Sequence, residues 1–168
     1  GRNGRGQPVV SLLPPSAQGD PEAIAKQLVL TEEVKGKQFV LLTDQGRIKR
    51  LPLSEFENLT ARGLTVLKLK GDDRLDYVEL TRGDSDAVVA TTGGRLLRLP
   101  IDDDQLPVLG RTAQGYQAVR LRKTERIAGL SVASASDELV LVTRQGRIKR
   151  LPANLLRQGR RGEIGTQA

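Results

Sequence analysis

The sequence contains 168 residues, of which 27 are Lys or Arg and 20 are Asp or Glu, so its formal net charge is +7 and its isoelectric point is about 10.1. A hydrophobic content of 38% can supply the core of a folded domain, and the basic charge favours a polyanionic partner such as nucleic acid. The chain has no Cys, His, Met or Trp, which excludes zinc sites built from Cys and His, disulfides, and catalysis by a Cys nucleophile or a His base.

Aromatic residues are scarce, and this bears on the kind of nucleic acid expected. Two Phe and two Tyr are too few to form the stacking platforms that hold single strands, so the duplex backbone is the expected target. No apolar run is long enough to span a membrane. The chain starts at Gly1 without a Met or a signal-peptide pattern, so we expect it to be a piece of a longer cytoplasmic protein.

The N-terminal part of the chain has the weakest secondary-structure signal. Residues 5–10 read Arg-Gly-Gln-Pro-Val-Val and match a glycine-containing element that recurs later in the chain. The segment Asp20–Glu33 could form a short helix by propensity. We expect a strand at Ala23–Leu30 instead, because this run occupies the same repeat position as Ile127–Val132.

One ten-residue segment occurs three times. It reads Thr-Asp-Gln-Gly-Arg-Ile-Lys-Arg-Leu-Pro at 43–52, and close matches at 91–100 and 143–152 follow at spacings of 48 and 52 residues. In each copy an apolar run precedes a turn with Gly, and Pro then ends the second strand because it cannot donate to a β-ladder. The repeats therefore predict three β-hairpins, with turns at Asp44–Gly46, Gly93–Gly94 and Arg144–Gly146.

Two further strands are expected after each of the first two hairpins. Leu64–Leu69 and Tyr116–Leu121 are the expected third strands, and Leu75–Leu80 and Ile127–Val132 are the expected fourth strands. Four short strands that recur about every 50 residues are typical of β-propeller blades. We therefore expect an all-β fold of four-stranded antiparallel blades, a partial propeller of about three repeats. The expected units are the end of a blade at 1–33, blades at 34–80 and 87–132, and the start of a blade at 137–168.

The repeated Gly-Arg-Ile-Lys-Arg-Leu-Pro segment is followed by Arg-Gly or Gln-Gly and then by a strand such as Val-Leu-Lys-Leu. This order resembles the blade repeat of the DNA gyrase A C-terminal domain family, and Arg5–Pro14 resembles a further strand of that family. The resemblance implies a pinwheel-like disc whose basic rim binds, bends and wraps duplex DNA without sequence preference, in support of ATP-dependent negative supercoiling. It also implies that this domain has no catalytic centre and no cofactor, because the catalytic tyrosine and the ATP and Mg²⁺ of the holoenzyme lie elsewhere.

The same resemblance implies the partners of the chain. These are double-stranded DNA, the rest of the gyrase A subunit, and the gyrase B subunit in an A2B2 holoenzyme of the cytoplasm, associated with the chromosome. No membrane is among them. Tyr77 and Tyr116 have the sequence surroundings of blade strands, so neither is expected to be catalytic.

One segment departs from the family pattern. Gyrases carry a Gln-Arg-Arg-Gly-Gly-Lys-Gly box in one loop, and the corresponding segment here is Gly159–Gly165. It keeps both Arg and two of the Gly residues, but Glu163 and Ile164 replace a Gly and a Lys. We expect this loop to bind DNA and to wrap it poorly, because its added negative charge faces phosphate. The equivalent domain of topoisomerase IV, which serves decatenation, stays open as an alternative.

Basic residues recur in every repeat and predict a ring of cations that contacts phosphates without reading bases. Neighbouring strand residues point to opposite faces, so not every cation can reach DNA, and the alternative for each is an ion pair packed between blades. Lys70 and Arg157 belong to the same basic sets. The expected DNA-binding residues are Arg47, Lys49, Arg50, Arg62, Lys68, Arg95, Arg98, Arg111, Arg120, Arg122, Arg147, Lys149, Arg150, Arg160 and Arg161.

Other classes of function are less well supported by the sequence. A protein-interaction propeller of the WD or kelch kind would carry Trp-Asp or Gly-His signatures, which this chain lacks. An enzyme would need a convergent polar site, and no His or Cys is available for one. The acidic runs at 72–73 and 102–104 lack the spacing of a calcium loop, so we expect solvated loops without a metal.

Overall fold

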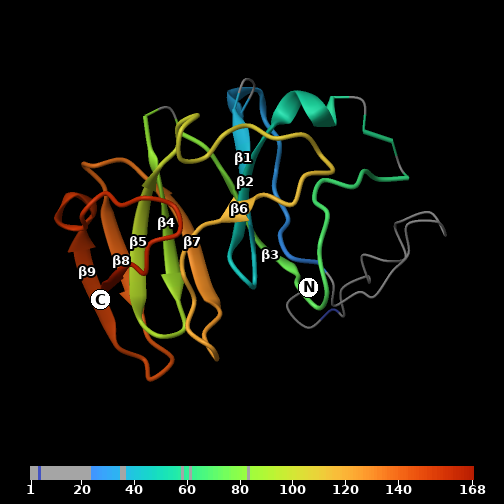
Figure 1. The fold of residues 1–168 in the computed structure, drawn as a ribbon. Helices are drawn as coiled ribbons and strands as arrows, with labels where there is room; N and C mark the ends of the chain where they lie inside the picture. Colours follow the sequence, from blue (N-terminus) through green and yellow to red (C-terminus); the bar gives the residue numbers. More distant parts are fainter. Residues whose placement is uncertain (1–3, 5–23, 35–36, 58, 61, 83) are drawn as a thin grey trace.

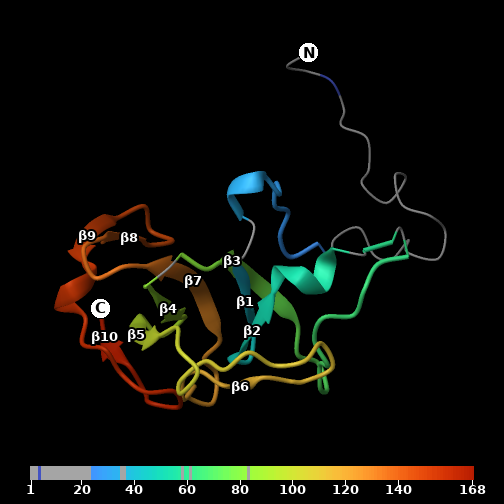
Figure 2. The ribbon, with the colours of Figure 1, turned by 90° about the horizontal axis from the view of Figure 1, so that it is seen from above.

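The computed structural model describes residues 4, 24–34, 37–57, 59–60, 62–82 and 84–168. These residues form three antiparallel sheets that stand side by side (Figure 1), and the view from above shows the sheets in a row (Figure 2). The all-β propeller architecture expected from the repeats is confirmed.

Each sheet is built on one of the three hairpins. The first sheet has the order β3-β1-β2-β6, the second has the order β10-β5-β4-β7, and the third pairs β8 with β9. The strands of the first sheet are β1 (Gln38–Thr43), β2 (Arg47–Pro52), β3 (Leu75–Leu80) and β6 (Tyr116–Gln117). Those of the second are β4 (Asp86–Thr91), β5 (Arg95–Pro100), β7 (Ile127–Ala133) and β10 (Thr166–Gln167). Those of the third are β8 (Glu138–Val142) and β9 (Ile148–Pro152), and short 3-10 helices lie at Glu32–Val34, Leu53–Phe56 and Ala153–Leu155.

The three predicted hairpin turns are confirmed. In the first hairpin Leu42 pairs with Ile48, and Gly46 in the turn has a φ of 90°, which a residue with a side chain rarely adopts. The turns of the other two hairpins contain Gly94 and Gly146 with φ values of 77° and 80°. All three turns lie at the same edge of the molecule, the lower edge in Figure 1, and we call it the hairpin edge.

The expected third strands are wrong in their partners and in their length. Of Tyr116–Leu121 only Tyr116–Gln117 forms a strand, and it pairs with β2 of the preceding repeat. β10 pairs with β5 in the same way, so each four-stranded sheet takes one strand from the following repeat. Residues 64–69 form no strand within the described part of the chain. Periodicity predicts that a segment can pair, but the free sheet edge that it reaches depends on how the repeats pack.

The exchanged strand approaches its partner closely, and this requires glycine. Gly115 has a φ of 80°, and a Cβ on it would lie 2.5 Å from the carbonyl oxygen of Ile48. Gly165, one repeat later, has a φ of 82°, and its Cβ would lie 2.8 Å from the carbonyl oxygen of Leu96. The positive φ and the close approach of the exchanged strand therefore explain why position 165 is a glycine.

The expected strand at Ala23–Leu30 is not formed. Ala23 lies outside the described residues, and 24–31 has no regular secondary structure. Leu28 packs against the first sheet, but the next two apolar side chains are largely exposed, Val29 at 83% and Leu30 at 57%. A strand with no face to bury gains little from pairing. The opening element expected at 5–10 also lies outside the described residues.

The core lies between the sheets, because the two faces of each hairpin point to different neighbours. Val40, Leu42 and Ile48 of the first sheet pack against Val89 and Leu97 of the second. The opposite face of the second sheet packs against β8 and the chain after β9. Alternation along each strand therefore places one apolar row in the core before the sheet and one in the core after it.

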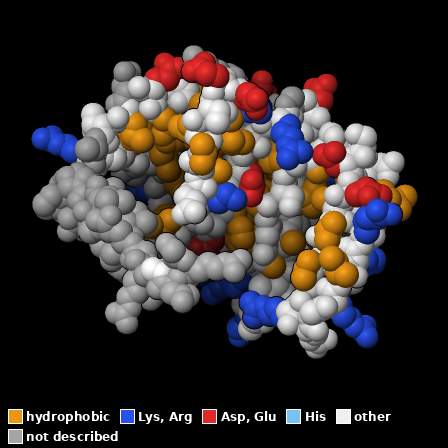
Figure 3. Space-filling view, turned by 180° about the vertical axis from the view of Figure 1, so that it is seen from behind, with side chains coloured by type: hydrophobic (Ala, Val, Ile, Leu, Met, Phe, Trp, Pro, Cys, Tyr) orange, Lys and Arg blue, Asp and Glu red, His pale blue; other side chains and the backbone are white. Residues whose placement is uncertain are grey.

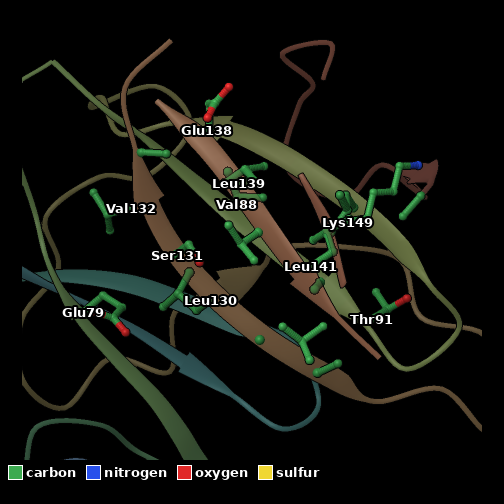
Figure 4. A pocket seen from close by; sticks show the side chains of 18 of the residues that line it. Glu79, Val88, Thr91, Leu130, Ser131, Val132, Glu138, Leu139, Leu141 and Lys149 are labelled. Carbon is green, nitrogen blue, oxygen red and sulfur yellow. The ribbon is translucent and has the colours of Figure 1, made fainter. Parts of the chain in front are cut away.

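A groove of about 1590 Å³ opens between the second and third sheets. Figure 4 shows Leu130, Ser131 and Val132 of β7 on one side of it and Leu139 and Leu141 of β8 on the other. Between the first two sheets the corresponding position is filled, because β3 packs against β7 there. The groove thus follows from the third sheet having two strands. No helix in the described residues is long and apolar enough to cross a membrane.

Candidate nucleic-acid interface

Charged side chains are not spread evenly over the molecule. On the face seen in Figure 3, Lys and Arg side chains lie along the lower edge, whereas Asp and Glu side chains gather along the upper edge. The lower edge is the hairpin edge, and residues within its turns or directly beside them include Arg47, Arg144 and Arg147. A polyanion is therefore attracted to one edge of the molecule and repelled by the other.

Lys49 was expected to bind DNA, but the structure places it inside the protein. Its side chain is fully buried, and its Nζ donates hydrogen bonds of 2.9, 2.9 and 3.0 Å to the carbonyl oxygens of Gly110, Arg111 and Ala113. Burial lowers the pKa of Lys49. Lys49 thus fastens the loop before β6 to the first sheet, and its charge is used within the fold.

Arg50 and Arg98 occupy equivalent positions in β2 and β5, and both are engaged between repeats. The Nη2 of Arg50 donates to Asp103 at 2.5 Å, and the Nε of Arg98 donates to Asp86 at 2.5 Å. Arg98 also donates to the carbonyl oxygens of Ala153 and Leu156, in the loop that follows β9. Both residues therefore have the alternative role considered for each cation, because they form contacts that pack the blades together.

Arg95 is buried in an ion pair with Glu125 at the turn end of the second sheet. Their side chains are 3% and 4% exposed, and Glu125 also accepts hydrogen bonds from the Thr91 hydroxyl and the Arg122 backbone N–H. Burial raises the pKa of Glu125, but these hydrogen bonds and the Arg95 charge outweigh it and lower the pKa to about 2. Arg95 therefore holds the chain before β7 onto the hairpin and is not available at the surface.

Three more of the expected residues have partners near the surface. Arg111 lies 3.3 Å from Glu55, and Arg150 lies 3.3 Å from Glu138. The guanidinium of Arg161 lies 3.9 Å from the centre of the Tyr116 ring, and its Nη1 donates to the Gln105 carbonyl at 2.9 Å. Exposed ion pairs are weak, so Arg111 and Arg150 can exchange their partners for phosphate at little cost, whereas Arg161 is held by several contacts.

The other expected residues are exposed and form no ion pair or side-chain hydrogen bond within the part of the chain that the structure describes. Lys70, from the same basic set, is in the same situation. The expected residues of this kind are Arg47, Arg62, Lys68, Arg120, Arg122, Arg147, Lys149 and Arg160.

The structure brings two of these cations together with Lys70 in one place, which we call the basic cleft. The cleft has a volume of about 240 Å³, and Arg47, Lys68 and Lys70 contribute to its walls. It lies at the turn of the first hairpin, between that turn, the segment before β3 and the exchanged strand β6. The rest of its lining comes from Thr43, Gln45, Asp73, Gln114 and Gln117.

Gln114 and Gln117 are members of the cleft that sequence reasoning missed. They belong to the following repeat and reach the cleft because β6 crosses to β2. The Nε2 of Gln117 donates to the Gln45 carbonyl at 2.9 Å, so it links the exchanged strand to the turn. The recurrence of a glycine with positive φ at Gly63, Gly115 and Gly165 was the available signal, since Gly115 and Gly165 directly precede the two crossing strands.

The box-like loop Gly159–Gly165 packs against the second sheet and against the chain that directly follows β6. The backbone N–H of Gly162 donates to the Ala118 carbonyl at 2.8 Å, and the Arg120 N–H donates to the Glu163 carbonyl at 2.8 Å. The Arg157 side chain donates to Glu163 at 2.6 Å, and this hydrogen bond lowers the pKa of Glu163. The carboxylate therefore neutralises Arg157, which lies just before the loop.

The acidic runs form contacts within the protein. Asp72 accepts from the Gln45 amide at 2.8 Å, Asp73 accepts from the Gln45 N–H at 3.0 Å, and Asp103 pairs with Arg50. Within the described ranges, no group of three or more Asp and Glu residues is arranged to hold a metal ion. The acidic residues thus serve to orient turns and cations.

Comparison with known families gives one match that covers most of the chain. The model of the DNA gyrase C-terminal domain, a β-propeller, matches residues 37–82, 85–134 and 137–168. The three matched segments correspond to the three hairpin repeats.

Curated relatives come from two kinds of topoisomerase. The chain is 36% identical over 168 residues to the A subunit of DNA topoisomerase 4 from Synechocystis sp., and the match covers 95% of this chain and 18% of the relative. It is 34% identical over 167 residues to the A subunit of DNA gyrase from Staphylococcus aureus, with coverage of 98% and 18%. The chain therefore spans about a fifth of the length of these relatives.

Solved structures share the fold at low sequence identity. A C-terminal domain of DNA topoisomerase IV matches with a TM-score of 0.73 and 22% identity, over 85% of this chain and 44% of that chain. The Escherichia coli ParC C-terminal domain matches with a TM-score of 0.73 and 18% identity, over 99% and 67%. A DNA gyrase A C-terminal domain matches with a TM-score of 0.70 and 20% identity, over 81% and 45%. With three repeats matched in register, the chain belongs to the DNA gyrase C-terminal domain family, the β-propeller domains of type IIA topoisomerase A subunits.

Proposed function

We propose that this domain binds duplex DNA through its phosphate backbone, without sequence preference, and bends it along the hairpin edge. The observation that supports this proposal is the set of exposed, unpaired cations at that edge, above all Arg47, Lys68 and Lys70 in the basic cleft. The catalytic steps and the use of ATP and Mg²⁺ are assigned by this proposal to other parts of the topoisomerase. The partners it implies are the B subunit and the remainder of the A chain, in an A2B2 complex of the cytoplasm.

The arrangement of the sheets supports bending as well as binding. The hairpin turns of successive sheets lie side by side at one edge (Figure 1), so a duplex that follows them passes exposed cations such as Arg47 of the first hairpin and Arg147 of the third. Each phosphate contact releases condensed counterions, and the gain from several contacts offsets a bending cost of a few kcal/mol over a short site. With aromatic residues at 2% of the chain, stacking contributes little.

The test is a binding titration of the 168-residue chain with duplexes of unrelated sequence, read by fluorescence anisotropy at several salt concentrations. We expect nearly equal affinities for all duplexes and a linear fall of log K with log salt. Salt-insensitive binding, or strong preference for one duplex, would contradict the proposal.

A second candidate role, within the same family, is that of a topoisomerase IV domain, which supports decatenation with little wrapping. The ion pair between Glu163 and Arg157 favours it, because Glu163 stands where gyrases carry a Gly and neutralises a nearby cation, and Ile164 stands where they carry a Lys. Replacing Glu163 by Gly and Ile164 by Lys in the full-length topoisomerase chain should increase wrapping, measured as the linking-number shift after nick ligation of a plasmid. If the parent protein already wraps as strongly as the double variant, this loop does not set wrapping and the second candidate loses its support.

A further inference from the structure

The hairpins of the first two sheets present an Arg at the same position, yet the two side chains have opposite environments. Arg95 is 3% exposed and ion-paired, whereas Arg47 is exposed and its side chain forms no ion pair or hydrogen bond with the described residues. The surrounding positions are equivalent in the two repeats. The matched pairs are Thr43 with Thr91, Gln45 with Gly93, Arg47 with Arg95, and Asp73 with Glu125.

In the second sheet the Glu125 side chain fills the space beside Arg95. It passes over Gly93, which has no side chain. A Cβ placed on Gly93 would lie 2.4 Å from the Oε1 of Glu125, so any other residue here would have to displace the carboxylate from its place beside Arg95. Gly93 therefore leaves room for the Glu125 carboxylate, which also accepts a hydrogen bond from the Thr91 hydroxyl. The result is a buried ion pair between Arg95 and Glu125.

In the first sheet neither condition holds. Gln45 stands where the second sheet has Gly93, and its amide Nε2 donates to Asp72 at 2.8 Å. Asp73 has one methylene fewer than Glu125, and its Oδ1 already accepts the backbone N–H groups of Gln45 and Arg74 at 3.0 and 2.9 Å. The carboxylate is thereby held at the turn, and the Arg47 guanidinium is left free.

The basic cleft occupies the place that the ion pair closes in the second sheet. Lys68 and Lys70 add two more unpaired ammonium groups to its walls, and the one acid in the lining, Asp73, is engaged by backbone donors. Three cations that share an open polar space with a single carboxylate leave a net positive charge there, which creates a positive local potential. An oxyanion is the ligand that such a space fits, and a volume of about 240 Å³ is ample for a phosphate group.

We propose that the basic cleft binds one phosphate group of the duplex backbone, with Arg47, Lys68 and Lys70 as its ligands, and that the Gln45/Asp73 pair keeps this site open. This inference rests on the proposed DNA-binding function and adds to it a defined site and a rule. Where Gln precedes Gly-Arg in the hairpin turn, as in the first repeat, the Arg is free to bind phosphate. Where Gly precedes Gly-Arg and a Glu lies just before the fourth strand, as in the second repeat, the Arg is buried in an ion pair. The third repeat has Gln145 before Gly146, and its Arg147 is exposed.

The first test removes one cleft cation. Arg47→Gln should weaken duplex binding several-fold near physiological salt and reduce the slope of log K against log salt by about 0.9, the effect of one phosphate contact. Arg82→Gln is the control, because it removes the same charge from a side chain that is 71% accessible, lies 4.0 Å from Asp137 and does not line the cleft. Equal effects of the two variants would overturn the proposal, since only the net charge would then matter.

The second test closes the cleft without changing the charge. Gln45→Gly combined with Asp73→Glu installs the arrangement of the second sheet, and the introduced glutamate should capture Arg47. We expect the same loss of slope as in Arg47→Gln, although the formal charge of the chain is unchanged. An unchanged slope in a folded double variant would show that Arg47 binds no phosphate.

The third test distinguishes the source of the phosphate. Inorganic phosphate is titrated into the unaltered chain and into Arg47→Gln, with backbone amide shifts of 43–47 as the readout. If millimolar phosphate binds only the unaltered chain while Arg47→Gln leaves the duplex slope intact, the site serves free phosphate and the duplex assignment is overturned. If the unaltered chain binds no duplex at any salt concentration, the proposed function itself fails, which the other outcomes would not imply.

Discussion

The first and second sheets are built from equivalent segments of two repeats, but they use equivalent cations differently. In the second sheet Arg95 and Arg98 are both tied to acids of the fold, whereas in the first sheet Arg47 at the hairpin turn is exposed. The strand positions behave alike, since Arg50 and Arg98 both hold a neighbouring loop. The difference therefore concerns the turn ends of the sheets, where one methylene and one glycine decide whether an Arg is structural or available.

Cations at equivalent positions of the repeats therefore have different roles in this molecule. Burying an Arg requires a carboxylate that can reach it and backbone that leaves room, and both depend on residues outside the recurring motif. Four predictions test this difference between the sheets, in order of decreasing effect.

The first prediction concerns removal of the Arg95 charge. Arg95→Gln leaves the Glu125 carboxylate buried and uncompensated, so the free energy of unfolding should fall by about 3–5 kcal/mol. Arg47→Gln, at the equivalent exposed position, should change it by less than about 0.5 kcal/mol. Urea denaturation followed by circular dichroism measures both values. Similar losses in the two variants would mean that the buried ion pair does not distinguish the sheets.

Acid should act on the second sheet through Glu125. Its pKa is lowered from 4.5 to about 2 in the folded chain, so the stabilisation is complete above pH 4.5 and is lost as the pH falls toward 2. The loss from this group is on the order of 3 kcal/mol. Glu125→Gln should remove that part of the pH dependence, which urea midpoints between about pH 6 and pH 2 would measure. An unaltered pH profile in the variant would place the acid sensitivity elsewhere.

Strand exchange predicts different costs for equivalent glycines. Gly115→Ala meets both a positive φ and the Ile48 carbonyl, so it should destabilise the chain by about 2–3 kcal/mol. Gly63 has a φ of 78° but no atom within 4 Å of its Cβ position, so Gly63→Ala should cost about 1 kcal/mol. Thermal unfolding of the two variants gives the comparison. It fails if Gly63→Ala proves as costly as Gly115→Ala.

The fourth and mildest change is at the Lys of the Arg-Ile-Lys-Arg motif. Lys49→Met removes three hydrogen bonds to the loop before β6 but also removes the cost of burying a charge, so we expect a loss of about 2 kcal/mol. Lys149 is exposed, and Lys149→Met should have almost no effect on unfolding. A loss in Lys149→Met that matches the loss in Lys49→Met would show that the carbonyl contacts contribute nothing.

The hairpins, the propeller class and the family could all be predicted from the sequence. Apolar runs interrupted by a turn glycine and ended by proline predict a hairpin from local chemistry alone, and the turns at Gly46, Gly94 and Gly146 have the positive φ that this chemistry requires. The recurrence of that hairpin indicated sheets that bury their faces against one another, which the cores between the sheets confirm.

Which strand joins which sheet, and which cations are free, depended instead on tertiary packing. Whether Tyr116–Gln117 pairs within its own repeat or with β2 depends on the free edge that lies near it after the repeats have packed, and periodicity carries no information on that. Lys49 and Arg95 look like surface cations in a polar motif, but the loop carbonyls and the Glu125 carboxylate that bury them come from segments about 30 to 60 residues away. Such partners are brought together by the fold, because the energy of burying a charge is settled by whatever surrounds it in space.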